Sequence, residues 1–199
     1  MFQFGLSGYD NDMVTNRFYI TTIGGRSFDP LSPEMKYIDV GDIAHSLSLI
    51  CRANGHFRQF FSVGRHCINC AREAEARGFS ARQRLLCLLH DATEAYIGDM
   101  TRPLKRRLPF YCECEEQLHD MILERFAIPR ESEAELRLVG EIDDCMLYHE
   151  FLLFNGDALY ETPPTLHIDI AHSEREFSQT KAEFLALFEK LMTEAGYKC

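Results

Sequence analysis

The chain has 199 residues, a length that fits a single domain. Hydrophobic residues make up 46% of it and charged residues 26%, which favours a buried core and excludes a mainly disordered chain. The formal net charge of −10 disfavours nucleic acid and anionic membranes as partners, so an anionic small molecule would need local cations or a metal ion at its site.

The first 40 residues predict a hairpin followed by irregular chain. A β-branched and aromatic run at 17–23 is followed by two glycines at 24–25 and a second short run at 26–28. This order is typical of a small β hairpin. Pro30 and Pro33 then interrupt the chain.

Helical periodicity begins near residue 42 and continues along the rest of the chain. Ser62 and Ser80 are expected to cap two of the helices, and Gly78 and Gly98 to end them. The predicted helices cover residues 42–50, 63–77, 81–97, 111–126, 131–154 and 173–195, with a basic loop at 98–110. The expected fold is therefore all-α, a helical bundle with a small N-terminal β hairpin. We predict one domain over 1–199, with a catalytic core at 42–154.

The cysteines are expected to be free thiols in a cytoplasmic protein. The segment 1–5 lacks a basic stretch followed by an apolar one, so no secretory signal is expected and the compartment should be reducing. No apolar run approaches the roughly 20 residues of a membrane span. Cys67 and Cys70 have the spacing of half a zinc site, but a matching second pair is missing. We interpret them as small apolar side chains that pack on a helix.

The strongest chemical signal lies at the end of the apolar run 85–89. His90 and Asp91 follow that run directly. Glu94 comes four residues after His90 and three residues after Asp91. On one continuous helix these offsets would place all three side chains on the same face. An imidazole and two carboxylates at the end of a buried helix are costly unless something satisfies them. A divalent cation with bound water would do so.

One helix cannot surround a metal ion, so further ligands must come from elsewhere. His66 and Asp143, each in the middle of a predicted helix, are the best candidates. Asp144 is the alternative to Asp143 and would point about 100° away around the helix. Two imidazoles and two carboxylates suit one divalent ion such as Mn, Fe, Co, Ni or Zn, without selecting among these or excluding Mg.

The four candidate ligands, in the order His … His-Asp … Asp, resemble the pattern of the HD superfamily of metal-dependent phosphohydrolases. Within that superfamily, residues 90–105 (HDATEAYIGDMTRPLK) are similar to bacterial 5′-deoxynucleotidases and to uncharacterised, phage-type HD hydrolases. Residues 42–52 and 54–56 also have close counterparts in the second group. The sequence departs from these relatives at Arg65, where they commonly carry Glu, and this changes the charge beside the expected pocket.

The resemblance implies a role for each matching residue. The metal ligands would be His66, His90, Asp91 and Asp143. The catalytic residues would be Glu94, which orients or activates the attacking water, and Asp91 beside the metal. The substrate would contact Arg52 through its phosphate, Asp99 near its sugar, and Lys105 in the basic loop.

Each of these roles has a structural alternative. Glu94 could be the partner of a histidine or an arginine, and Arg52 could be an ordinary cation at a helix C-terminus. Asp99 could serve turn chemistry, and Lys105 could belong to a solvated run of charges.

From these features we expect hydrolysis of a phosphomonoester by metal-bound water, with a nucleoside or deoxynucleoside 5′-monophosphate as the substrate. The alternative is a catalytically silent nucleotide-binding or regulatory module with the same fold, although retention of every ligand argues against it. Oxidation by a di-iron centre is disfavoured, because the extra histidines that it needs are missing. A homodimer is compatible with the amphipathic last helix, by analogy with relatives.

Overall fold

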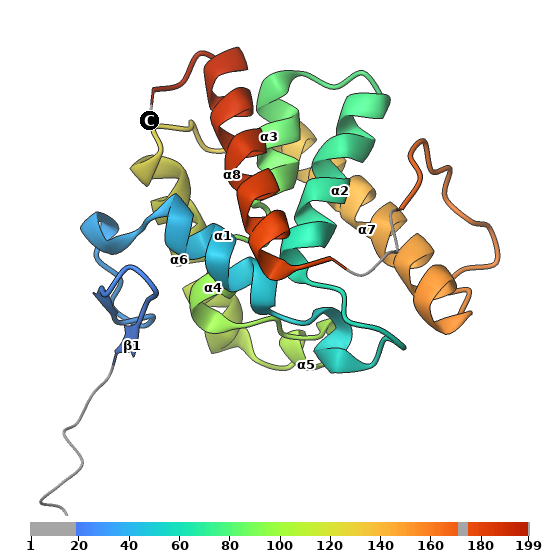
Figure 1. Cartoon of the computed structure of the whole chain (residues 1–199), viewed down its shortest axis with the longest axis horizontal. Helices are drawn as coiled ribbons and strands as arrows, with labels where there is room; N and C mark the ends of the chain where they lie inside the picture. Colours follow the sequence, from blue (N-terminus) through green and yellow to red (C-terminus); the bar gives the residue numbers. More distant parts are fainter. Residues whose placement is uncertain (1–18, 171–174, 199) are drawn as a thin grey trace, which may run out of the picture.

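The computed structural model describes residues 19–170 and 175–198, and these are mainly helical (Figure 1). Two strands, β1 (Ile20–Thr21) and β2 (Ser27–Phe28), pair antiparallel at the N-terminal edge. The predicted all-α fold with a small N-terminal hairpin is therefore confirmed for the described residues. Residues 17–18 of the predicted hairpin and 173–174 of the predicted last helix lie outside them.

The remaining elements are helices joined by short connections. They follow in the order α1 (Val40–Leu49), α2 (Val63–Ala76), α3 (Ala81–Leu89), α4 (Glu94–Ile97), α5 (Arg102–Lys105), α6 (Pro109–Arg125), α7 (Glu133–Asn155) and α8 (Phe177–Glu194). Single 3-10 turns occur at Met35–Tyr37 and Arg52–Gly55. The two predicted serine caps are confirmed, because Ser62 and Ser80 each accept a hydrogen bond from the backbone amide three residues ahead.

The predicted continuous helix over 81–97 is wrong, because the chain turns between α3 and α4. The amide of Ala92 donates to the carbonyl of Leu89, and the amide of Glu94 donates to the carbonyl of Asp91. These bonds span three residues, and the tighter turns that they form end the α-helix. Glu94 therefore begins a new short helix, and helical offsets from His90 do not place it. The predicted basic loop at 98–110 likewise contains the short helix α5.

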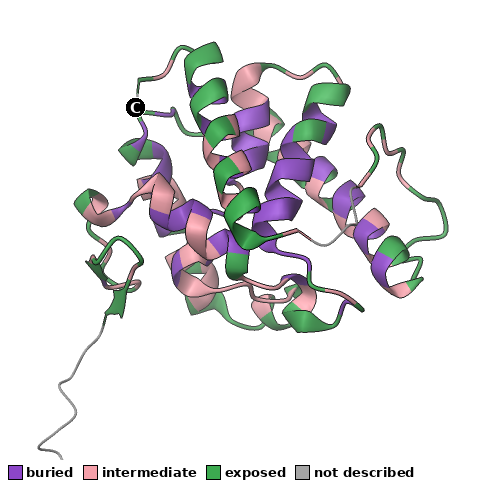
Figure 2. Cartoon of the chain, viewed as in Figure 1, coloured by how far each residue is buried: buried purple, intermediate pink, exposed green. Residues whose placement is uncertain are grey.

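Helix α2 lies at the centre of the molecule and is buried along most of its length (Figure 2). Helices α1, α3 and α8 pack around it, and the main hydrophobic core lies between them. Gly64 allows α1 to approach α2 closely, since a Cβ there would lie 3.1 Å from the backbone of Leu47. A polar side chain on such a helix needs a partner inside the protein.

Among the described residues, none of the helices is both long and apolar enough to cross a membrane.

Arg82 joins three parts of the chain beside the start of α7. Its guanidinium donates to Glu135 at 2.6 Å, to the hydroxyl of Tyr197 at 2.8 Å and to the carbonyl of Pro129 at 3.0 Å. Glu135 also closes the capping box at Ser132 that begins α7. The hydrogen bond from Arg82 lowers the pKa of Glu135 from 4.5 to about 2.

We expect Glu135→Gln to reduce the free energy of unfolding at neutral pH by about 1–2 kcal/mol. A carboxyl whose pKa is lower in the folded state stabilises the fold above its unfolded pKa, and this stability is lost as the pH falls toward the folded pKa. At about pH 3 less than half of the difference from the unsubstituted protein should therefore remain. Urea denaturation at both pH values measures this, with the exposed Glu133→Gln as control. An equal loss at both pH values would contradict the assignment.

Candidate metal centre

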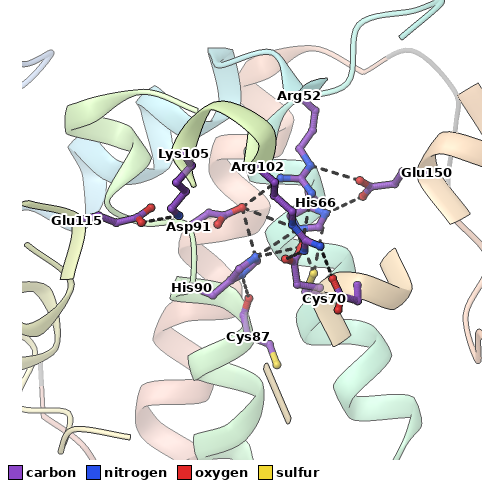
Figure 3. A network of polar contacts seen from close by, with 12 residues as sticks. Arg52, His66, Cys70, Cys87, His90, Asp91, Arg102, Lys105, Glu115 and Glu150 are labelled. Atoms are coloured by element: carbon purple, nitrogen blue, oxygen red, sulfur yellow. Dashed lines mark hydrogen bonds and ion pairs between the residues drawn. The ribbon is translucent and has the colours of Figure 1, made fainter. Parts of the chain in front are cut away.

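Side chains from α2, α7 and the turn after α3 converge on one point (Figure 3). The Nε2 atom of His66 lies 3.0 Å from Oδ1 of Asp143 and 3.3 Å from Nε2 of His90. The Nε2 atom of His90 lies 3.3 Å from Oδ2 of Asp91. The Nε2 atom of His66 lies 3.8 Å from Oδ2 of Asp91, and the Nε2 atom of His90 lies 3.8 Å from Oδ1 of Asp143. Ligand atoms about 2.1 Å from one ion lie roughly 3.0–3.5 Å apart, so this spacing fits a metal centre.

Each imidazole is held in its orientation by a hydrogen bond at Nδ1. The Nδ1–H of His90 donates to the backbone carbonyl of Cys87 at 2.8 Å, and a carbonyl can only accept. The Nδ1 of His66 lies 2.8 Å from the carboxylate of Glu150, which is fully buried. Each ring therefore carries a proton on Nδ1 and directs its Nε2 atom at the convergence point. Metal-binding histidines are held in this way.

The charged groups at the convergence point change one another's pKa values. Burial disfavours charge on His90, yet Asp91 and Asp143 outweigh it and raise its pKa well above the ordinary value. Burial and Arg52 disfavour charge on His66, but Glu150 and Asp143 raise the pKa of that group as well. Burial by itself would raise the pKa values of Asp91 and Asp143, but the imidazoles outweigh it and lower both values. The carboxylates thus favour positive charge at the imidazoles, and a divalent ion would replace those protons.

Two thiols border the same point from α2. The Sγ of Cys70 lies 3.4 Å from Nε2 of His66. Among the described residues, the groups that could hold an ion are His66, Cys70 and His90, and also Cys67, His90 and Asp91. Burial raises the pKa of Cys67 to about 11 and that of Cys70 well above its ordinary value, so both stay protonated near neutral pH. Cys67 and Cys70 are therefore buried packing residues, as predicted, but they also lie beside the two histidines.

Arg52 lies against the candidate ligands and is largely buried. Its guanidinium contacts Asp91 at 3.3 Å, Asp143 at 3.6 Å and Glu150 at 3.3 Å. Ala53 and Asn54 follow with left-handed φ values of 54° and 50°. Such a backbone is costly for residues other than glycine, and costly conformations cluster at functional sites. The structure therefore does not support the interpretation of Arg52 as an ordinary helix-terminal cation.

Glu94 is 6% exposed, and its Oε2 has no hydrogen-bond partner in the described part of the chain. Burial, followed by the charges of Asp91 and Asp99, raises its pKa well above the ordinary value. A buried carboxylate oxygen without a partner costs free energy. A cation at the neighbouring ligands would favour its ionised form, so this orphaned oxygen fits a site built to hold one.

A cavity of about 460 Å³ opens on this cluster, within the range of small-molecule sites. Its charged side chains are Arg52, Asp91, Glu94, Asp99, Arg102, Lys105 and Asp143. Burial raises the pKa of Asp99. The charge of Arg52 lowers that pKa, but the charge of Asp91 raises it further. Lys105 pairs with Glu115 of α6, to one side of the cluster (Figure 3). Lys105 lines the cavity, and its ammonium group forms an ion pair with Glu115.

The two adjacent aspartates of α7 have different surroundings. Asp143 reaches both imidazoles, whereas Asp144 is 51% exposed at its side chain and contacts Arg102 at 2.5 Å. Arg102 also binds the outer oxygen of Asp143 at 2.6 Å. The structure therefore places Asp143, not Asp144, among the candidate ligands.

Sequence reasoning missed two residues of the site, Glu150 and Arg102. Glu150 follows Asp143 by seven residues, about two helical turns, so its position on the same face could have indicated it. Arg102 lies in the basic loop, three residues before Lys105, the cation that the resemblance favours. No local signal separates these two cations, because only the fold brings Arg102 to Asp143.

Comparisons with known proteins identify two relatives, both of them uncharacterised. No family model matches the chain. It is 39% identical over 112 residues to the uncharacterized protein YfdR of Escherichia coli, a match that covers 56% of this chain and 60% of that protein. It is 36% identical over 113 residues to the uncharacterized protein RCAP_rcc00048 of Rhodobacter capsulatus, covering 54% of this chain and 57% of that protein. The chain thus spans less than two thirds of both relatives.

Proposed function

We propose that this protein is a metal-dependent phosphohydrolase of the HD type that cleaves a phosphomonoester. The substrate class is a nucleoside or deoxynucleoside 5′-monophosphate. One observation carries this proposal: each of two carboxylates lies within 3.8 Å of both imidazoles, and these carboxylates line a cavity together with two arginines. The match to the motif of residues 90–105 supports the same reaction class.

The donor set suits a divalent ion, which would lower the pKa of water and polarise a phosphoryl oxygen. Arg52 and Arg102 flank the candidate ligands and neutralise the negative charge of the phosphate group. Glu94 takes a proton from the attacking water as the water oxygen bonds to phosphorus and the P–O ester bond breaks. Glu94 then returns that proton to the leaving oxygen, which departs as an alcohol. Asp99 accepts a hydrogen bond from a sugar hydroxyl. These local cations explain how a chain of net charge −10 holds a phosphate.

The first test is phosphate release from a panel of nucleoside monophosphates. Metal-stripped protein is reloaded separately with Mn, Co, Mg or Zn, and bound metal is measured in each sample. We expect release from a subset of the monophosphates, and only with metal present. Absence of release with every metal, from protein shown to bind it, would favour a silent nucleotide-binding module.

Glu94→Gln is expected to lower kcat by about 10²–10³-fold while the bound metal stays at the same stoichiometry. The amide keeps the size of the side chain but cannot accept a proton from water. Glu113→Gln, an exposed change on α6, serves as the matched control. If Glu94→Gln lost its metal together with its activity, Glu94 would be a ligand and not the proton acceptor.

A further inference from the structure

The cavity has an apolar end that the proposed reaction does not use. Its lining residues there are Phe57, Leu147, Phe151, Leu159 and Tyr160. Leu159 and Tyr160 are 40% and 44% exposed, so their surfaces are open to a ligand. Aromatic and aliphatic side chains beside a few charged groups are typical of sites for small organic ligands.

Helix α7 carries both ends of the cavity on one face. Asp143, Leu147 and Phe151 recur at intervals of four residues, a spacing that stacks side chains along a helix. At 1.5 Å per residue, Phe151 lies about 12 Å along the axis from Asp143. If the phosphate of a ligand lies near Asp143, the apolar side chains contact the part of the ligand that is farthest from phosphorus.

The segment after α7 forms part of the cavity wall through Leu159 and Tyr160, and it is held in place. Gly156, in the left-handed conformation with φ 78°, ends α7 and turns the chain back. The ring of Tyr160 stacks on Tyr148, with centroids 5.7 Å apart and planes 14° from parallel. The Nε2–H of His149 donates to the carbonyl of Pro164 at 2.8 Å. These contacts make the wall part of a preformed site.

We propose that this apolar end binds the planar ring of the substrate's leaving group, a nucleobase, through Tyr160 and Phe151. The inference rests on the proposed function and assigns the residues that distinguish nucleotides from simple sugar phosphates. The side chains of this end carry no charge, and aromatic rings favour flat partners. Stacking of a base on an aromatic side chain contributes about 1–3 kcal/mol, which corresponds to roughly 5- to 150-fold in affinity.

The test compares a nucleoside 5′-monophosphate with ribose 5-phosphate, which has the phosphate and sugar but no base. The ratio of their kcat/KM values is expected to fall about tenfold or more in Tyr160→Ala. Tyr160→Phe, which keeps the ring, should retain most of the ratio. Leu152→Ala is the control, because Leu152 is an exposed residue of α7 that does not line the cavity. An unchanged ratio in both Tyr160→Ala and Phe151→Ala would overturn the inference.

Binding without turnover separates this inference from the proposed function. Metal-loaded Glu94→Gln protein is titrated calorimetrically with each ligand, with and without Tyr160→Ala. We expect the nucleotide to bind at least about tenfold more tightly than ribose 5-phosphate, and to lose that advantage in Tyr160→Ala. Equal affinities, or no detectable binding of either ligand, would overturn the inference. Tight, Tyr160-dependent binding without hydrolysis by the unsubstituted protein would support it and reject the hydrolase.

Discussion

Asp143→Asn is expected to lower kcat/KM for a nucleoside monophosphate by about 10⁴-fold and to remove tightly bound metal. A bound ion contributes several kcal/mol to phosphoryl transfer, and 1.4 kcal/mol corresponds to a factor of ten. Asp143 contacts His66 at 3.0 Å and His90 at 3.8 Å, so its carboxylate completes the donor set. An amide is a weaker, uncharged donor and would leave the ion underbound.

Asp144→Asn provides a matched control for this change. The two residues are adjacent, the substitution is the same, and each variant loses one ion pair with Arg102. Only Asp143 reaches the imidazoles, so Asp144→Asn should keep its metal and most of its activity. Metal content after dialysis, steady-state kinetics and circular dichroism compare the two proteins. Equal losses in both variants would contradict the assignment of Asp143 as a ligand.

Glu150→Ala is expected to reduce the free energy of unfolding by about 3 kcal/mol or more. Glu150 is fully buried and contacts both the imidazole of His66 and the guanidinium of Arg52. Its removal leaves the buried Arg52 with only two carboxylates and His66 without its Nδ1 partner. Urea denaturation measures the loss, with Glu141→Ala, an exposed change on the same helix, as control. A loss no larger than that of the control would show that Glu150 does not support the site.

Glu150→Gln separates positioning of His66 from stability. The amide oxygen can still accept the Nδ1–H bond, but the negative charge that would make His66 a stronger metal ligand is lost. Removing such a supporting group typically lowers metal affinity 10- to 100-fold. Competition with a chelator measures the metal dissociation constant, and Glu141→Gln again serves as control. Unchanged metal affinity would limit Glu150 to a structural role.

Local signals in the sequence determined most of the helices and the set of candidate ligands. The serine caps at Ser62 and Ser80 and the apolar periodicity act over three or four residues, so they can be read without knowledge of the fold. The order His66, His90-Asp91, Asp143 is likewise visible in the chain, although the role of each residue stays a prediction. Periodicity failed at 90–93, where tight turns replace the continuous helix.

Only the tertiary structure decided which groups meet. Glu150 lies 84 residues from His66 along the chain, and Arg102 lies 41 residues from Asp143. Such contacts depend on how α2, α5 and α7 pack, and no local pattern encodes that packing. The same packing surrounds Arg52 with carboxylates and places an apolar wall beside the candidate ligands. The sequence by itself determined the local helices and the candidate donors, because those depend on neighbouring residues. The cavity and its charge balance required the fold, because they arise between distant ones.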